Sequence, residues 1–281
     1  MAAEHRQMNG PHADAAPGAL MEFDAIVLAA DRGSNDPVAV AAGVAAKCLT
    51  PIAGSPMVVR VVRALDQSGC VRRIVLCGPG AEALQGSPVL NELVEDGSVR
   101  WMGPQATPAA SAAAVLATLP DAIPVLLTTG DHALLSAEMV RHFLGAASAA
   151  GGDVAVALAP HDLVRNTYPR TRRTVLKFSD GHFCGCNLFA FLTPRARRMA
   201  RLWQQVENDR KNPVRVIGFV GWVAMARYAL GMLSLPAAVR RLSKRTGIDA
   251  TVVTMPFAEA AIDVDSVADL ELVRAIVARA S

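Results

Sequence analysis

The chain has 281 residues, of which 52% are hydrophobic and 19% are charged, and its formal net charge is +3 at pH 7. Such a chain can bury a sizeable core, and its length suits one large α/β domain or two modest ones. The small net charge does not by itself indicate nucleic-acid binding, so we expect no nucleic-acid partner. The five cysteines lack the spacing of a disulfide framework and indicate reduced thiols and a cytoplasmic protein.

Residues 1–22 are polar, rich in alanine and interrupted by proline. They lack the charged and apolar regions of a signal peptide. We expect a mobile N-terminal tail whose His5 and His12 are solvated rather than metal ligands.

Short apolar runs alternate with helical patterns along the first half of the chain. Strands are predicted at residues 25–29, 73–77, 99–101, 124–128 and 154–159, with helices at residues 57–68, 108–119 and 137–149. Short apolar strands separated by helices favour an α/β fold with a mostly parallel central sheet and helices on both faces.

The second half is less regular. An arginine-rich loop is predicted at residues 161–174, strands at 175–178, 184–191 and 250–254, and helices at 195–207, 214–231, 236–246 and 267–279. With no internal repeat and no clear linker, residues 23–281 are expected to form a single domain.

The most apolar stretch of the second half is residues 213–239, which Arg215, Arg227 and Pro236 interrupt. The window between the two arginines is too short for a transmembrane helix. We interpret the stretch as a buried helix pair. The alternative is a surface that contacts a membrane or a lipid-like substrate.

Two loops that follow predicted strands carry polar residues, at the edge of the sheet where ligands of open parallel sheets bind. In the first, Gly33, Ser34 and Asn35 allow an open turn whose backbone N–H groups can face phosphate oxygens. Arg32 and Lys47 supply the cations that a triphosphate needs. The alternative is an ordinary strand-to-helix turn with two solvated charges.

The second loop places Asp131 directly after a buried strand. A carboxylate there is costly to desolvate unless it is paired or binds a cation, and Mg²⁺ suits a carboxylate that acts together with phosphate oxygens. Asp131 could instead cap the next helix, but Ser136 is the better N-cap. Asp131 is therefore a candidate metal ligand.

A third polar segment, "AAIDVDSVADLELVRAIV", precedes the last helix. Asp263 and Asp265 alternate on a predicted strand end and are expected to point to opposite faces, one of them toward Asp131. Ser266 and Asp269 form a capping-box variant that opens the helix. The alternative is a pair of solvated acids.

Taken in this order, the segments resemble the signature of nucleotidyltransferases with a GT-A-type, Rossmann-like fold. The resemblance rests on "IVLAADRGS", "KCLTPIAGSPM", "LLTTGDHALL", "CGCNLFAF" and "IDVDSVADLELVRAI". The branch that it resembles most is the MobA-like NTP transferases, which include molybdenum-cofactor guanylyltransferase and cytidylyltransferase.

The resemblance implies Mg²⁺-dependent transfer of an NMP unit from an NTP, with GTP or CTP favoured, and release of pyrophosphate. The acceptor would be a phosphorylated small molecule or a lipid-like phosphate. Residues 23–150 would form a nucleotide-binding half, and residues 151–281 an acceptor-binding half with a helical C-terminal part.

Each implied role falls on a residue that matches the family pattern. The resemblance places Leu28, Ala29 and Ala30 in the base and ribose pocket. It places Arg32, Gly33, Ser34 and Lys47 at the triphosphate, and Ser111 and Gly130 near the nucleotide. Asp131 and Asp265 would form the metal site, and Asn187 would contact the acceptor. The catalytic residues would be Lys47, Arg32 and Asp131.

The arginine-rich loop is the expected partner of the acceptor's phosphate. Its candidates are Arg165, Arg170, Arg172 and Arg173. The alternative is a solvated basic segment.

The sequence also departs from the family pattern. Asp31 replaces a glycine of the first motif, His132 follows Asp131, and Ala133 replaces a proline. Cys184 and Cys186 lie where small residues are usual, and we expect them to be buried rather than to bind a metal.

Two other functions compete with nucleotidyl transfer. One is a GT-A-type glycosyltransferase that uses a nucleotide sugar, which the motif around Lys47 disfavours. The other is a non-catalytic nucleotide-sensing domain, which stays an alternative because Asp31 replaces a glycine of the first motif.

Overall fold

The computed structural model describes residues 21–30, 35–208 and 221–280. In these residues the strands are β1 (Phe23–Leu28), β2 (Pro51–Ile52), β3 (Ser55–Pro56), β4 (Val71–Cys77), β5 (Arg100–Met102), β6 (Val125–Thr129), β7 (Val154–Pro160), β8 (Val175–Phe178), β9 (Gly181–Phe191) and β10 (Ala250–Thr254). The predicted N-terminal tail, with His5 and His12, lies almost wholly outside the described residues.

The central sheet has the order β10-β7-β9-β6-β1-β4-β5, and β8 pairs with β9 beside this path. Neighbouring strands are parallel except where β9 runs antiparallel to β6, β7 and β8. Strands β2 and β3 form a separate small hairpin. The mostly parallel sheet confirms the predicted α/β class.

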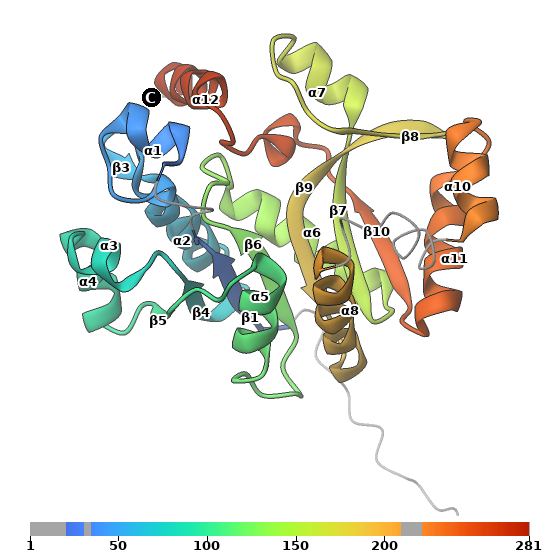
Figure 1. Cartoon of the computed structure of the whole chain (residues 1–281), viewed down its shortest axis with the longest axis horizontal. Coiled ribbons are helices and arrows are strands. Elements are labelled where there is room, and N and C mark those ends of the chain that lie inside the picture. Colours follow the sequence, from blue (N-terminus) through green and yellow to red (C-terminus); the bar gives the residue numbers. More distant parts are fainter. Residues whose placement is uncertain (1–20, 31–34, 209–220, 281) are drawn as a thin grey trace, which may run out of the picture.

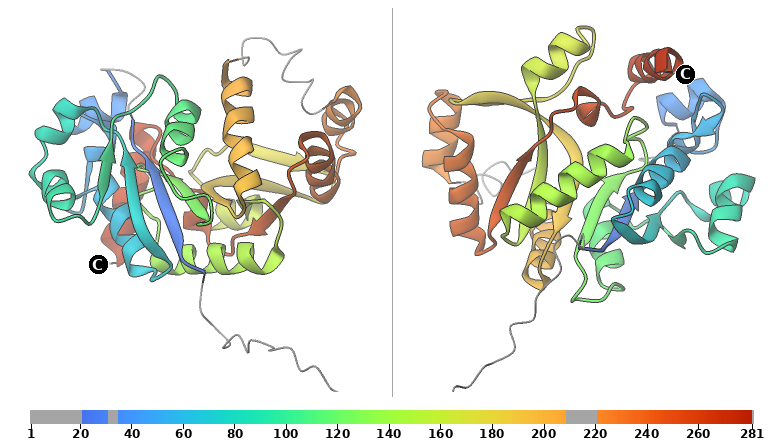
Figure 2. Two further views of the ribbon diagram at one scale, coloured as in Figure 1. Left: turned by 90° about the horizontal axis from the view of Figure 1, so that it is seen from below. Right: turned by 180° about the vertical axis from the view of Figure 1, so that it is seen from behind.

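Helices cover both faces of the sheet, as Figures 1 and 2 show. They are α1 (Pro37–Ala42), α2 (Met57–Gln67), α3 (Ala81–Gln85), α4 (Pro88–Glu95), α5 (Pro108–Leu116), α6 (Ala137–Ala150), α7 (His161–Thr167), α8 (Arg197–Asn208), α10 (Trp222–Ala229), α11 (Leu235–Thr246) and α12 (Val267–Ala280), with 3-10 turns at η1 (Lys47–Leu49), η2 (Pro194–Ala196) and η3 (Ala258–Ala261). Helices α5 and α8 pack together on one face, and α2 and α6 on the other. The predicted helical C-terminal part is present.

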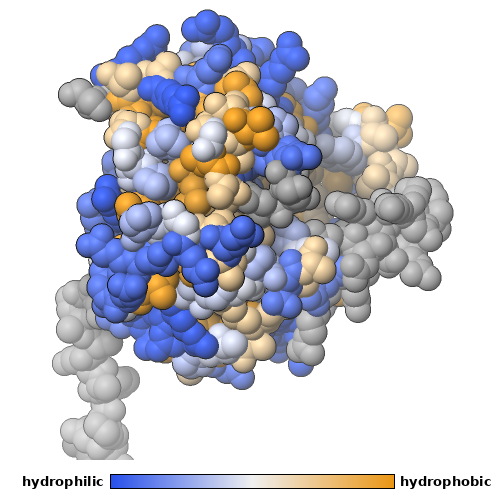
Figure 3. Space-filling view, turned by 60° about the vertical axis from the view of Figure 1, so that its left-hand side comes forward, coloured by the Kyte–Doolittle hydropathy of each residue, from blue (hydrophilic) through white to orange (hydrophobic). Residues whose placement is uncertain are grey.

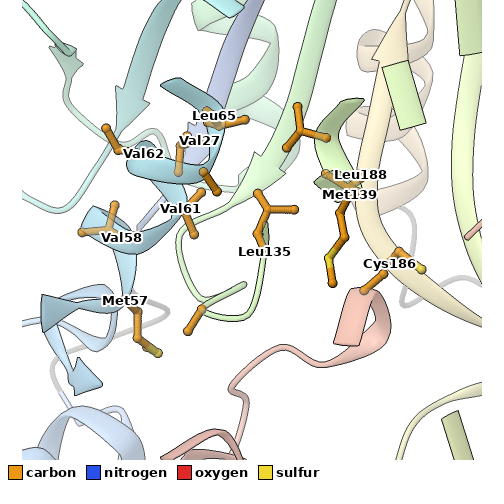
Figure 4. Close-up of a cluster of buried hydrophobic side chains, with 14 of the residues drawn as sticks. Val27, Met57, Val58, Val61, Val62, Leu65, Leu135, Met139, Cys186 and Leu188 are labelled. Atoms are coloured by element: carbon orange, nitrogen blue, oxygen red, sulfur yellow. The ribbon is translucent and has the colours of Figure 1, made fainter. Parts of the chain in front are cut away.

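The larger core lies between the sheet and helices α2, α6 and α12. All six residues of β1 are buried, and α2 directs Val58, Val61 and Leu65 toward the sheet. Figure 4 shows Val61 and Leu65 close to Val27 of β1, with Leu135, which follows β6, beside Val61. The apolar spacing along α2 therefore places its buried face against β4 and α6.

The carboxyl ends of β1 and β6 meet at one edge of the sheet. Leu28 pairs with Thr129, and the Gly130 N–H donates a hydrogen bond to the Leu28 carbonyl over 2.8 Å. A Cβ atom on Gly130 would lie 2.9 Å from the Cβ of Ala29, so only glycine allows this close approach. The two loops singled out in the sequence are thereby brought together.

Some helices differ from the sequence prediction. The segment predicted as an arginine-rich loop begins with helix α7, so that prediction is wrong for residues 161–167. Helices α1, α3 and α4 were not expected either. Helix α1 has a local signal, because Asp36 caps its N-terminus and Pro37 occupies its first turn.

The interpretation of residues 213–239 as a buried helix pair is wrong for the described part, which begins at residue 221. Helix α10 and the turn after it expose apolar side chains, with Leu230 at 72% and Met232 at 58% of their full accessible surface. No helix among the described residues is both long and apolar enough to cross a membrane.

The face in Figure 3, which turns the α3–α4 side forward, is mostly hydrophilic with groups of hydrophobic residues between.

Candidate active site

A pocket of about 520 Å³ lies at the carboxyl edge of the sheet. Its walls come from the ends of β1 and β6, the turn η1, the start of α5, strand β9, helix α8 and the segment before α12. Parallel strands bring distant loops to one edge, which explains why segments far apart in the sequence share this pocket.

The end of β1 forms one wall of the pocket. Leu28, Ala29 and Ala30 line it, together with Ser111 from α5. Ser111 is buried, and its hydroxyl accepts a hydrogen bond of 2.9 Å from the Gln105 N–H, which holds the loop before α5. Apart from Ser111, this wall consists of small or apolar residues.

Lys47 lies between two aspartates in the pocket. Its ammonium Nζ donates to Asp131 Oδ2 over 2.7 Å and to Asp265 Oδ1 over 2.9 Å. Burial alone would lower the pKa of Lys47, but the two aspartates raise it above its ordinary value. Lys47 therefore stays charged and joins segments that are far apart in the sequence.

Asp263 also faces the pocket, so the prediction that Asp263 and Asp265 point to opposite faces is wrong. Residues 262–265 form no strand, which removes the expected alternation. The Val264 N–H donates to the Asp131 carbonyl over 3.2 Å, which ties this segment to the loop after β6. Burial, with the charges of Asp131 and Asp265, raises the pKa of Asp263 to about 6, although Arg173 opposes the shift.

A second charged cluster lies behind Asp263. The Arg173 guanidinium is only 9% exposed and donates through Nη1 to Asp263 and through Nη2 to Asp269. The Asn187 amide donates to Asp263 Oδ2 over 2.7 Å. The Asp269 N–H donates to Ser266 Oγ over 3.2 Å, and Ser266 Oγ donates to Asp269 Oδ2 over 2.7 Å, which confirms the predicted capping-box variant. Arg173 thus joins the acidic segment to the first turn of α12.

The donor set fits a divalent cation that also binds a substrate's phosphates. Oδ1 of Asp131 is buried and accepts no hydrogen bond from the described residues, which is costly for a carboxylate oxygen. In the described ranges no group of three or more His, Cys, Asp or Glu residues could hold a metal by itself. Mg²⁺ commonly binds one or two carboxylates and takes its remaining ligands from phosphate and water.

The far wall of the pocket is aromatic. Phe189 on β9 and Trp203 on α8 line it and stack with ring centroids 6.5 Å apart and an angle of 29° between the rings. Asn187, two residues before Phe189, is in the left-handed region with φ 49°, which asparagine tolerates better than most residues. The pocket is therefore acidic at its centre and aromatic on the β9–α8 side.

The sequence model of a protein family, the MobA-like NTP transferase domain, matches residues 25–218, more than half of the chain. The chain belongs to this family. The match spans β1 to the region after α8 and so contains the pocket's principal walls, apart from the Asp263–Asp265 segment. It confirms the family suggested by the sequence motifs.

Solved structures similar to this MobA-like NTP transferase share its fold. A hypothetical transferase from Thermus thermophilus is 28% identical, covers 89% of this chain and 100% of its own, and has a TM-score of 0.73. The structure of CMP:2-keto-3-deoxy-manno-octonic acid synthetase complexed with CTP is 14% identical, covers 92% of this chain and 100% of its own, and has a TM-score of 0.55. The second likeness shows the fold alone.

One curated relative matches a short part of the chain. The bifunctional protein GlmU of Exiguobacterium sp. is 45% identical over 65 residues, which are 23% of this chain and 13% of that protein. The chain thus spans a small part of this relative's length.

Most of the predicted site residues that the structure describes meet at the pocket. Leu28, Ala29, Ala30, Lys47, Ser111, Asp131, Asn187 and Asp265 line it. Gly130 does not line the pocket but lies next to it, where its N–H donates to the Leu28 carbonyl. Arg32, Gly33, Ser34 and Asp31 lie outside the described residues. The roles assigned to all these residues stay predictions.

The four predicted acceptor arginines lie elsewhere. Arg172 is exposed, and Arg173 is held by Asp263 and Asp269. None of the four lines the pocket. Cys184 and Cys186 are buried, as expected.

The sequence did not reveal Asp36, Phe189 or Trp203 as pocket residues. Asp36 carries a local signal as the N-cap of α1, where its Oδ1 accepts the Val38 N–H over 2.9 Å. Phe189 and Trp203 are ordinary apolar residues in their strand and helix, so only the tertiary structure shows that they face the pocket.

Proposed function

We propose that this chain transfers a nucleotidyl group from an NTP, with GTP or CTP favoured, to a phosphorylated acceptor and releases pyrophosphate. The observation that carries the proposal is the convergence of Lys47, Asp131 and Asp265 beside the small apolar wall of β1 in a MobA-like NTP transferase. A triphosphate needs a cation and a metal-binding acid at such a wall.

In the proposed reaction, an oxygen of the acceptor's phosphate attacks the α-phosphorus of the NTP. The bond from the α-phosphorus to the oxygen bridging the β-phosphate breaks, and its electron pair leaves with pyrophosphate. The nucleophile is already anionic, so no strong general base is needed. The protein therefore acts by positioning and by neutralising charge.

The residues of the pocket divide this work. Asp131 and Asp265 would hold Mg²⁺, which neutralises charge at the reacting phosphates. Lys47 would exchange its contacts with these carboxylates for contacts with the triphosphate. Arg32, together with the N–H groups around Gly33 and Ser34, would bind the same phosphates. Asn187 would contact the acceptor.

The aromatic wall adds to the proposed acceptor site. Phe189 and Trp203 present apolar surface on the β9–α8 side of the pocket, next to Asn187. An acceptor with a phosphate and a flat or apolar body would be bound best by this arrangement.

The proposal is tested by a screen of the four common NTPs against a panel of phosphorylated metabolites. We expect Mg²⁺-dependent pyrophosphate release with one NTP and only in the presence of a suitable acceptor. Release of a nucleoside diphosphate from a nucleotide sugar would instead identify a glycosyltransferase. Tight NTP binding without turnover of any acceptor would favour a nucleotide sensor.

Replacing Lys47 by Ala is expected to raise the KM for the NTP and lower turnover by about 10-fold or more, because a charge-assisted contact to phosphate is lost. The measurement is initial rate against NTP concentration, with Lys177→Ala as control because Lys177 is exposed on β8. An unchanged NTP dependence in the folded Lys47 variant would remove Lys47 from the triphosphate site.

A further inference from the structure

Helices α10 and α11 form the outer edge of the molecule beyond β10. They lie on the side opposite α3 and α4, both in Figure 1 and in the view from behind in Figure 2. Half of the exposed large hydrophobic residues of the described ranges belong to α10 and the turn after it. They are Val223 (59% exposed), Met225 (37%), Leu230 (72%) and Met232 (58%). We call these four residues the apolar edge.

The chain holds this edge firmly in place. The Tyr228 hydroxyl accepts the Lys177 N–H over 3.1 Å, and its ring packs edge-on against Phe178 of β8. The Ser179 N–H donates to the Leu233 carbonyl over 2.9 Å, and Leu233 is buried. The exposed side chains therefore project from a helix and turn that are fixed to the β8–β9 hairpin.

The segment that contains helices α10 and α11 is strongly basic. Residues 221–248 contain five cations and no Asp or Glu, the cations being Arg227, Arg240, Arg241, Lys244 and Arg245. Arg240 and Lys244 are exposed and lie one turn apart on α11, so they share a face of the helix. Apolar side chains are thus combined with an excess of positive charge, and the acid that contacts the start of α11 is Asp180, which accepts the Leu235 N–H over 2.8 Å.

We propose that the edge formed by α10 and α11 docks on the surface of an anionic lipid bilayer. Apolar side chains beside lysines and arginines are the arrangement by which proteins bind at a membrane interface without crossing it. The apolar edge enters the boundary between headgroups and acyl chains, while the cations contact anionic headgroups.

The charge favours a bilayer over a second copy of the chain. A two-fold contact through this edge would place the same patch on both subunits and bring cations against cations. An anionic bilayer instead attracts the exposed cations, such as Arg240 and Lys244, with about a fivefold gain in binding for each. The charge complementarity is therefore with lipid headgroups.

The test is co-sedimentation of the full chain with vesicles, without NTP or acceptor, so that the result does not depend on the proposed function. We expect binding to vesicles of phosphatidylcholine mixed with phosphatidylglycerol, much weaker binding to phosphatidylcholine alone, and loss of binding at high salt. Equal binding to both vesicle types, or none to the anionic ones, overturns the proposal.

Two pairs of substitutions locate the surface. Replacing Leu230 and Met232 by Asp should abolish sedimentation, whereas Val89→Asp, an exposed apolar position on α4, should not change it. Replacing Arg240 and Lys244 by Glu should weaken binding by about twentyfold or more. The matched control reverses Arg73 and Arg100, which are exposed on β4 and β5.

Other occupants of the edge would give different results. If a second copy covers it, the Leu230 and Met232 variant changes the mass found by light scattering without vesicles. If residues 209–220 of the same chain cover it, that variant unfolds at a lower temperature than wild type. Either result, or unchanged vesicle binding by this variant, overturns the proposal.

Discussion

Replacing Asp131 by Asn is expected to lower Mg²⁺-dependent pyrophosphate release by at least about 100-fold, the scale on which removing one charge-stabilising group acts in other enzymes. The side chain keeps its shape but loses its charge, and Oδ1, which is buried without a hydrogen-bond donor among the described residues, can no longer serve as an anionic ligand. The measurements are pyrophosphate release and the affinity for the NTP with and without Mg²⁺.

Binding and stability separate this role from a structural one. We expect the metal-dependent part of NTP affinity to disappear while metal-free binding remains, because Lys47 is still present to contact the triphosphate. Asp66→Asn, at an exposed position on α2, is the control for the same chemical change. A folded Asp131→Asn protein with near-normal turnover would exclude Asp131 from the metal site.

The sequence predicted best those elements whose signals are local. Strand β1 is apolar apart from Asp24 and was expected within two residues of its observed start and one residue of its end. Ser136 caps α6 by accepting the Met139 N–H, as its position before a helical pattern indicated. Buried strands and capped helices carry these signals within a few residues, so long-range structure adds little to them.

Helix α7 shows where local signals fail. It has seven residues, and only Val164 among them is buried. A helix this short is marginal by itself and depends on its contacts with neighbouring elements, here β7, β9 and η3. Its polar, arginine-containing sequence therefore looked like a loop.

Helix α10 shows a different limit. Its apolar sequence suggested burial, but apolar residues also make up much of a protein's surface, and hydropathy alone does not say what covers a helix.

The acidic segment before α12 shows a third limit. Its conformation depends on Arg173, Asn187 and the carbonyl of Asp131, which are all distant in the sequence.

These long-range contacts lead to a second large effect, at Arg173. Its two guanidinium nitrogens contact different carboxylates, Asp263 in the pocket and Asp269 in the first turn of α12. Asp269 Oδ2 also accepts the Asp265 N–H over 3.3 Å. Removing Arg173 would leave Asp263 and Asp269 without their common cation and remove one of the contacts that position the segment carrying Asp265.

Arg173→Ala is therefore expected to destabilise the protein by about 3 kcal/mol, as breaking a buried ion pair from one side commonly does. We also expect kcat to fall by about 100-fold at a temperature where the variant is folded, because the segment that carries Asp265 is positioned less precisely. Arg173→Lys should recover only part of both losses, because one ammonium cannot reproduce the planar fork that contacts two carboxylates. The measurements are thermal unfolding, kcat and the two KM values.

Arg172→Ala is the matched variant, because Arg172 is the exposed neighbour in the same loop. If the loop binds the acceptor's phosphate, as the sequence predicted, Arg172→Ala should raise the acceptor KM and leave kcat, NTP affinity and stability nearly unchanged. The two arginines would then have separate roles, Arg172 on the acceptor and Arg173 in positioning the acidic segment. An Arg173→Ala protein of normal stability and kcat, with only the acceptor KM raised, would contradict the positioning role. Arg173 would then be assigned to the acceptor site, as the sequence predicted.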